Sequence, residues 1–341
     1  MFSDFEKDDV FVIAEVGQNH QGSLEKALEY IRIFAFEGAD AIKFQTRDNK
    51  FLFDRNSYKA AYDSENAFAS TYGEHRECLE LTKDDVIILK KSCEEHGVKF
   101  MSTPFDEPSL EFLAGIGTEV LKVASFDIGN IPFLTKIART KIPTVMSIGG
   151  GNDEQINKSV EVFRKEHTEL ALLHCVSEYP CPVENLGLSN IPKLINNYKY
   201  PLIGSSDHFN GTLSGPIAYM LGARVFEKHV TLNRSWTGTD HSFALEPDGF
   251  RRFVRDIRRV KNMMPTKAKE ELGNEFVFKK LGKSICASKN LNIGDILSVE
   301  NMSGKIYQDK GVPVRESANF LGKKVIVNIK AGEKIRYEDI Q

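Results

Sequence analysis

The chain has 341 residues, 41% hydrophobic and 27% charged, which is typical of a soluble globular protein with two domains or one large α/β barrel plus an appendage. A net charge of −3 argues against nucleic-acid binding, and no apolar run approaches the roughly 20 residues that span a membrane. Five cysteines without a CxxC pair and an acidic N-terminus unlike a signal peptide predict a cytoplasmic protein without a disulfide framework.

From residue 10 to about 265, short β-rich runs alternate with helical stretches. The first run is followed by an amphipathic stretch that begins at the plausible N-cap Ser23 and ends at Gly38. A long polar insertion follows the second run. The predicted strands are 10–15, 41–45, 99–103, 120–125, 143–149, 170–175, 201–206 and 224–229, and the main helical patterns include 23–38, 82–97 and 247–264.

The strands read as continuous apolar runs, which indicates burial on both faces of a parallel sheet. Eight βα units predict a (β/α)₈ TIM barrel, and the alternative is an open doubly wound sheet. The barrel is favoured by the number of units and by the absence of GxGxxG after the first strand. The predicted barrel domain covers 1–264, a charged linker covers 265–283, and a small, mostly β module covers 284–341.

Polar residues cluster where the predicted strands end. In a barrel these ends meet at one rim, where catalytic groups lie. Lys43 and Lys122 interrupt apolar strands, which is costly unless each meets an anion or reaches water. A phosphate or carboxylate ligand would satisfy both lysines and use the hydroxyls of Ser125, Ser147 and Ser206. Snorkelling at the rim and a Schiff-base lysine, as in an aldolase, are the alternatives.

Two histidines, His208 and His229, end the seventh and eighth strands, which are neighbours in a barrel. Surface polarity explains one such histidine, but two at matching places can hold a divalent ion such as Mn²⁺ and leave positions open for water and substrate. The ion would polarise a carbonyl.

Eight motifs resemble those of N-acetylneuraminate (sialic acid) synthases, and the C-terminal module is similar to their antifreeze-like (SAF) domain. The motifs are "IAEVGQNHQGSLEKA", "GADAIKFQT", "STPFD", "LKVASFDIGNIPFL", "LLHCVSEYPCP", "SSDH", "FEKHVTL" and "TGTDHSFALEP". The resemblance implies a (β/α)₈ barrel fused to a small cap. It also implies a reaction between phosphoenolpyruvate and the open aldehyde form of an N-acetylated amino sugar, with release of phosphate.

The resemblance also implies residue roles. Phosphoenolpyruvate would meet Lys43, Lys122, Ser125, Ser147, Ser177 and Ser206; His208 and His229 would bind Mn²⁺ (or Mg²⁺ or Co²⁺); Gln45, Tyr179 and Asp240 would meet the sugar; and Glu15 or Asp127 would be the catalytic acid or base. Ser177 stands where the family often has asparagine, and Asp127 where bacterial members often have glutamate. The sugar is expected to be N-acetylmannosamine, with its 6-phosphate or the precursors of legionaminic or pseudaminic acid as alternatives.

The family's cap reaches the partner subunit's active site through an arginine, which implies a domain-swapped homodimer. No arginine occupies that register here, and Lys305, Lys310 and Arg315 are the cationic candidates. Two other readings stay open at this point, a Schiff-base aldolase and a non-catalytic barrel that carries a binding module.

Overall fold

The computed structural model describes residues 2, 5–6, 9–198 and 202–341. The chain divides into two compact units, Met1–Met264 and Pro265–Gln341. Within the described part of the chain, no helix combines the length and the apolar character that a membrane crossing requires.

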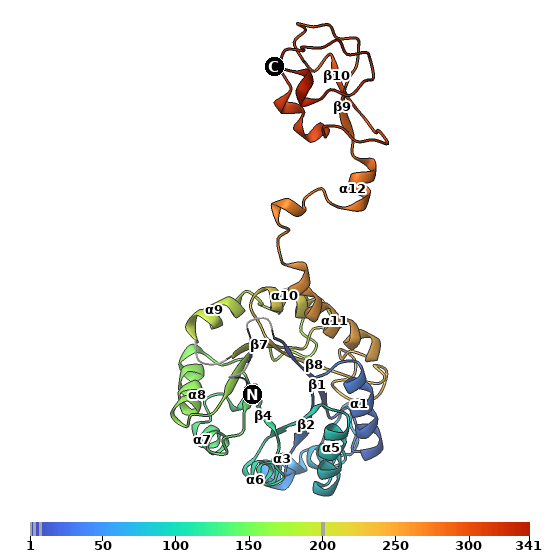
Figure 1. Cartoon of the computed structure of the whole chain (residues 1–341). Coiled ribbons are helices and arrows are strands. Elements are labelled where there is room, and N and C mark those ends of the chain that lie inside the picture. Colours follow the sequence, from blue (N-terminus) through green and yellow to red (C-terminus); the bar gives the residue numbers. More distant parts are fainter. Residues whose placement is uncertain (1, 3–4, 7–8, 199–201) are drawn as a thin grey trace. The chain divides into compact units, whose positions relative to one another are not determined.

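The first unit is a closed barrel of eight parallel strands in chain order (Figure 1). The strands are β1 (Phe11–Gly17), β2 (Ala41–Thr46), β3 (Lys99–Pro104), β4 (Val120–Val123), β5 (Thr144–Ser147), β6 (Leu170–Cys175), β7 (Leu202–Asp207) and β8 (Val225–His229). β8 pairs back onto β1, so that His229 lies opposite Glu15. This closure confirms the predicted TIM barrel and excludes the open doubly wound sheet.

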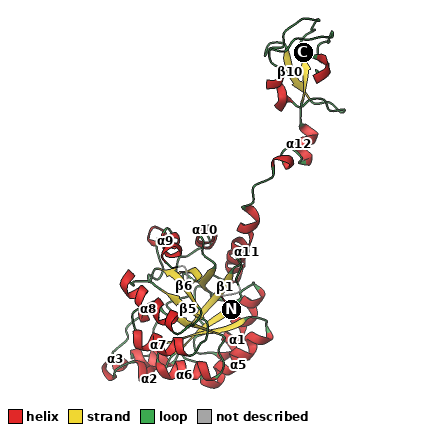
Figure 2. Ribbon diagram, turned by 60° about the vertical axis from the view of Figure 1, so that its left-hand side comes forward, coloured by secondary structure: helices red, strands yellow, loops and turns green. Residues whose placement is uncertain are grey.

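Helices form an outer layer around the strands (Figure 2). They are α1 (Leu24–Phe36), α5 (Lys83–Glu95), α6 (Glu107–Gly115), α7 (Ile131–Arg139), α8 (Asp153–Lys165), α9 (Asn190–Asn197), α10 (Ser214–Met220) and α11 (Pro247–Met263). Ser23 caps α1 as predicted, because its side chain accepts a hydrogen bond from the backbone N–H of Lys26.

The strands bury both faces in two separate apolar cores. Outward side chains such as Val12 and Ile42 pack with the helices, whereas inward side chains such as Ile13, Ala41 and Met101 fill the barrel interior. The alternation follows from the two-residue period of a strand. The inward positions become polar toward the carboxyl end of each strand, and this change places charged groups above an apolar plug.

The long polar insertion after β2 contains three short helices, α2 (Asn49–Leu52), α3 (Arg55–Lys59) and α4 (Tyr72–Glu77). Asp48, Asp54 and Thr71 cap them. An aromatic cluster anchors α4, because the buried ring of His75 packs against Tyr62 with 4.5 Å between ring centroids.

The second unit contains α12 (Phe276–Leu281) and the antiparallel pair β9 (Ser284–Ala287) and β10 (Met302–Lys305). Two similar sequence segments, 291–297 and 329–335, pair with each other through Leu291 and Ile329. Each turns at a glycine with positive φ, and Leu297 and Ile335 enter the same small core. The weak repeat visible in the sequence is thus a repeat in the structure.

Candidate active site

A cavity of about 750 Å³ at the carboxyl ends of the barrel strands receives side chains from all eight of them. Its strand-borne residues are Glu15, Lys43, Gln45, Thr103, Lys122, Ser147, Cys175, Ser206, Glu227 and His229. Catalytic residues of TIM barrels come from these strand ends. This cavity is therefore the candidate active site.

Two lysines and two glutamates form a buried ion network on its floor. The ammonium of Lys43 lies 2.8 Å from a Glu15 oxygen and 3.6 Å from a Glu227 oxygen, and that of Lys122 lies 3.9 Å from Glu227. Each of these side chains is at most 5% exposed. Mutual neutralisation explains how apolar strands tolerate four charges.

The network separates the acidities of its two carboxyl groups. Burial raises the pKa of Glu15, and Lys43 offsets this only in part. Burial would also raise the pKa of Glu227, but Lys122 and Lys43 together lower it to about 2. Pairs of carboxyl groups with divergent pKa values divide acid–base and charge-holding roles between them. Glu15 is thus suited to exchange a proton, and Glu227 to remain an anion.

The two lysines also differ. Burial would lower the pKa of Lys43, but Glu15 and Glu227 raise it, so this ammonium stays charged. Burial lowers the pKa of Lys122, and Glu227 compensates incompletely. A lowered pKa is also what a Schiff-base lysine needs, so Lys122 is the residue on which the aldolase alternative rests.

Hydroxyl groups follow the neighbouring strands β4, β5 and β7. Ser206 donates to Glu227 across 2.9 Å, whereas the buried Ser147 hydroxyl has no hydrogen-bond partner among the described residues. A Cβ atom on Gly149 would lie 2.5 Å from the Ser177 hydroxyl and 3.0 Å from that of Ser125. Only glycine therefore allows these two hydroxyls to gather beside β5, where an oxyanion could accept hydrogen bonds.

The two histidines meet as the strand order predicts. The ring centroids of His208 and His229 are 5.3 Å apart, and Tyr179 lies against His208 at 3.9 Å. His208 Nδ1 hydrogen-bonds to the Val176 carbonyl oxygen at 2.7 Å. Burial lowers the pKa of both rings, that of His208 to about 4, so both are neutral near pH 7.

The donor set fits a divalent metal ion that takes part of its coordination from other molecules. A backbone hydrogen bond of the kind made by His208 Nδ1 orients metal-binding imidazoles. His229 Nδ1 is buried without a hydrogen-bond partner among the described residues, 3.7 Å from an Asp240 oxygen. No group of three or more His, Cys, Asp or Glu that could hold a metal ion occurs in the described part of the chain. The protein alone thus offers two nitrogens.

Most of the predicted site residues line this one cavity. They are Glu15, Lys43, Gln45, Lys122, Ser125, Ser147, Tyr179, Ser206, His208, His229 and Asp240. Ser177 is exposed next to it, close to Gly149. Asp127 lies outside the lining, in a 3₁₀ turn after the end of β4, and accepts a hydrogen bond from Asn130.

Sequence reasoning placed Glu227 at a strand end but gave it no role. The two-residue period of β8 could have selected it, because Glu227 and His229 share the inward face. Lys228, between them, points away from the cavity and pairs with Asp207 at 2.9 Å. Three cavity residues carried no earlier signal, namely Gln18, Arg47 and Arg76.

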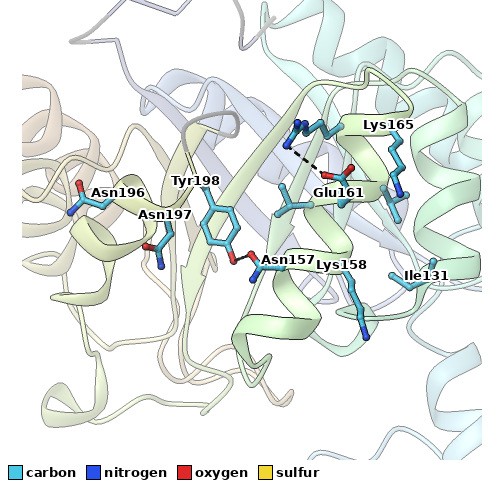
Figure 3. A pocket seen from close by; sticks show the side chains of 11 residues that line it. Ile131, Asn157, Lys158, Glu161, Lys165, Asn196, Asn197 and Tyr198 are labelled. Atoms are coloured by element: carbon cyan, nitrogen blue, oxygen red, sulfur yellow. Dashed lines mark hydrogen bonds and ion pairs between the residues drawn. The ribbon is translucent and has the colours of Figure 1, made fainter.

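Another hollow, of about 930 Å³, lies outside the barrel along α8 and the end of α9 (Figure 3). Its polar groups are paired with one another: Tyr198 donates to Asn157 at 2.7 Å, and Arg164 lies 3.6 Å from Glu161. The latter two side chains are 69% and 44% exposed. Without buried charge or unpaired donors, this hollow offers no catalytic arrangement.

Comparison with known proteins agrees with this site. The model of the NeuB family matches residues 30–269. The chain is 35% identical to human N-acetylneuraminate-9-phosphate synthase over 96% of its own length and 92% of that protein. It is 32% identical to N,N'-diacetyllegionaminic acid synthase of Legionella pneumophila over 97% and 94% of the two chains.

Solved structures give the same result. N-acetylneuraminic acid (sialic acid) synthetase from Leptospira borgpetersenii, in complex with citrate, has a TM-score of 0.70 and 32% identity, and the match covers 78% of this chain and 90% of that one. A truncated 3-deoxy-D-arabino-heptulosonate 7-phosphate synthase from Thermotoga maritima, 15% identical with a TM-score of 0.57, shares the fold. Given the family match and these relatives, the chain belongs to the NeuB family, whose members similar to it are named as synthases of sialic and legionaminic acids.

Proposed function

We propose that this protein condenses phosphoenolpyruvate with the open aldehyde form of an N-acetylated amino sugar. Carbon 3 of the enol forms a bond to the aldehyde carbon, water adds to carbon 2, and inorganic phosphate leaves by C–O cleavage. The product is a nonulosonic acid, N-acetylneuraminate when the sugar is N-acetylmannosamine. The observation that carries this proposal is the joining, in one cavity, of the lysine–glutamate network, the serine hydroxyls and the histidine pair.

The lysines and serines form the phosphoenolpyruvate half of the site. Lys43 and Lys122 neutralise an anion, and the unpartnered hydroxyl of Ser147 donates to one of its oxygens. Ser125, Ser206 and the adjacent Ser177 supply further hydroxyls. The same lysines stabilise the negative charge that grows on the phosphate as it departs.

Glu15 is the group that takes the proton of the attacking water. Its raised pKa brings it nearer neutrality, where a general base works best, and such catalysis contributes about 10²–10⁴-fold. Gln45 donates to Glu15 at 2.8 Å and fixes the orientation of this carboxyl group. Asp127 has the right chemistry but lies outside the cavity lining.

His208 and His229 would hold a divalent cation, Mn²⁺ first among the candidates, with Mg²⁺ or Co²⁺ as alternatives. When bound, the cation supplies Lewis-acid polarisation of the sugar aldehyde. Asp240 lies beside His229, and Tyr179 covers His208. These two residues border the space where the sugar binds.

A phosphate-release assay tests the function. The protein is mixed with phosphoenolpyruvate, Mn²⁺ and, in turn, N-acetylmannosamine, its 6-phosphate and the precursors of legionaminic and pseudaminic acids. Release that depends on one of these sugars is expected. No release with any of them would leave the non-catalytic barrel as the better description.

The Schiff-base aldolase is separated by a second assay. Borohydride is added in the presence of pyruvate, and the mass of the protein is measured. A synthase should form no adduct, whereas a pyruvyl adduct on Lys122 would show that this lysine is the nucleophile.

We also propose that the C-terminal module, residues 284–341, is an antifreeze-like (SAF) cap that closes a barrel during the reaction. Its compact core of Ile285, Leu291 and Phe320 supports an independently packed module. Exclusion of water from the reacting centre is the service that such a cap performs.

A further inference from the structure

Two arginines lie on one wall of the cavity, apart from the lysine–glutamate network. Arg47 follows β2, and Arg76 belongs to α4 in the insertion. Arg47 is only 4% exposed in its side chain, and its guanidinium lies 3.8 Å from the centre of the Phe105 ring. Burial, followed by the nearby charge of Arg76, lowers the pKa of Arg47 to about 10.

This wall carries more positive than negative charge. Glu80 pairs with Arg47 at 3.3 Å, but Arg76 forms no ion pair within the described part of the chain. Arg76 instead donates one N–H to the Gln18 side-chain oxygen at 2.5 Å. Buried cations are usually paired, so a second anion is missing here.

Two buried donors on the same wall are also unused. The Nε of Arg76 and the Nε2 of Gln18 have no hydrogen-bond partner among the described residues. Buried donors without partners are uncommon in folded proteins, and they indicate a ligand with acceptor oxygens. Arginine pairs are suited to phosphate, which can accept two N–H groups from each guanidinium.

The wall is connected to the reacting centre through one side chain. Gln45 donates to Glu15 at 2.8 Å and accepts from Arg47 at 2.5 Å. The serine hydroxyls proposed for phosphoenolpyruvate follow β4, β5 and β7, whereas the arginine wall follows β2 and comes from the insertion. A sugar with its aldehyde near Glu15 can therefore extend its other end toward Arg47 and Arg76.

On the basis of the proposed function, we infer that Arg47, Arg76 and Gln18 bind a phosphate group at the end of the acceptor sugar opposite the aldehyde. The acceptor is then a phosphorylated N-acetylhexosamine, such as N-acetylmannosamine 6-phosphate, rather than the neutral sugar. Arg76 is the residue that sets this preference, because its charge is not balanced by a carboxylate within the described part of the chain.

The test compares N-acetylmannosamine 6-phosphate with N-acetylmannosamine in the phosphate-release assay. The wild type should give the higher kcat/KM with the phosphorylated sugar. Arg76→Gln should lower that value about 10- to 100-fold, mainly through KM, because it removes a charge-assisted hydrogen bond. The KM for phosphoenolpyruvate should stay unchanged, which distinguishes the sugar's phosphate from that of phosphoenolpyruvate.

Two variants serve as comparisons. Arg76→Lys keeps the charge without the planar fork and should fall between the wild type and Arg76→Gln. Lys50→Ala removes an exposed cation of α2 that does not line the cavity, and it should behave as the wild type with both sugars.

A binding measurement keeps this inference separate from the proposed function. With phosphoenolpyruvate in excess, calorimetry should detect N-acetylmannosamine 6-phosphate binding that Arg76→Gln weakens by the same factor. Equal use of the two sugars, equal losses with both in Arg76→Gln, or unchanged calorimetric affinity would overturn the inference. Absence of phosphate release with either sugar would instead overturn the proposed reaction, while calorimetry still decides whether the arginines bind the phosphate.

Discussion

Single residues of the cavity have roles that depend on their neighbours. Glu15 and Glu227 are both buried on the same floor, yet the two lysines next to Glu227 make it the stronger acid. Burial alone would have given two similar carboxyl groups. The division of roles therefore arises from the position of Lys122, which pairs with Glu227 only.

Replacing either histidine should remove the metal site. His208→Ala and His229→Ala are expected to abolish both turnover and Mn²⁺ retention, because each leaves a single imidazole. Electron paramagnetic resonance of added Mn²⁺ measures retention directly, and circular dichroism checks that the fold is intact. Full activity of both variants in the presence of a chelator would contradict the assignment.

The two candidate bases can be compared directly. Glu15→Gln should lower kcat by about 10²–10⁴-fold, with phosphoenolpyruvate affinity close to that of the wild type. Asp127→Asn should have a much smaller effect, because Asp127 lies outside the cavity lining and already hydrogen-bonds to Asn130. Steady-state rates and calorimetry measure the two quantities. A larger loss in Asp127→Asn would reverse the assignment.

Glu227 should also contribute to stability in a pH-dependent way. Glu227→Gln leaves Lys122 without a charged partner, which should lower the free energy of unfolding at pH 7 by roughly 3–5 kcal/mol. The pKa of Glu227 is lowered to about 2 in the folded state, against an ordinary value of about 4.3. Its contribution is therefore fully present above pH ~4.3 and is lost as the pH falls through 2.

Urea unfolding at pH 7 and pH 3 measures this effect. The difference between wild type and Glu227→Gln should be smaller at pH 3. Glu119→Gln is the matched control, because its ion pair with Lys99 is partly exposed and contributes at most about 1 kcal/mol. A difference that does not change with pH would show that the loss of packing, rather than charge, accounts for the destabilisation.

At the level of elements, the strands could be predicted and the insertion could not. The eight apolar runs identified β1 to β8, since burial on both faces leaves a clear sequence pattern. The period within each run then places Lys43, Lys122 and His229 on the inner face. The residues between β2 and α5 have no such period, because capping side chains and an aromatic cluster hold three short helices there. Arg47 and Arg76 could therefore be located only in three dimensions.

The paired turns of the second unit give a prediction at this scale. Gly294 has a φ of 100°, and a Cβ atom there would meet nothing closer than 3.7 Å. Gly294→Ala should therefore destabilise the unit by backbone strain alone, by roughly 1–3 kcal/mol. Hydrogen exchange of the full chain should show faster exchange in 284–341 and unchanged protection in β1 to β8. Lys330→Ala, in the equivalent second turn, changes a residue without positive φ and should leave both regions unchanged.

On the scale of the whole molecule, the net charge is −3, yet four cationic side chains and three carboxylates line the cavity within the described part of the chain. The local surplus opposes the overall sign and attracts anionic substrates to the site. The second unit presents apolar side chains, since Phe276, Val277 and Phe278 of α12 are more than half exposed within the chain. A partner subunit would explain why this surface is apolar.

The last prediction is a homodimer in which the C-terminal caps are exchanged. The segment 265–283 can extend up to ~3.3–3.6 Å per residue, which allows it to cross between subunits. A chain with His208→Ala lacks the metal site, and a chain truncated at residue 282 lacks the cap, so each should be nearly inactive alone. Mixed under conditions that let dimers re-form, the cap of the first chain should cover the intact barrel of the second, and activity should return. Light scattering should report a dimer for the full-length protein. A cap that closes its own barrel, or a monomer by light scattering, would give no recovery of activity.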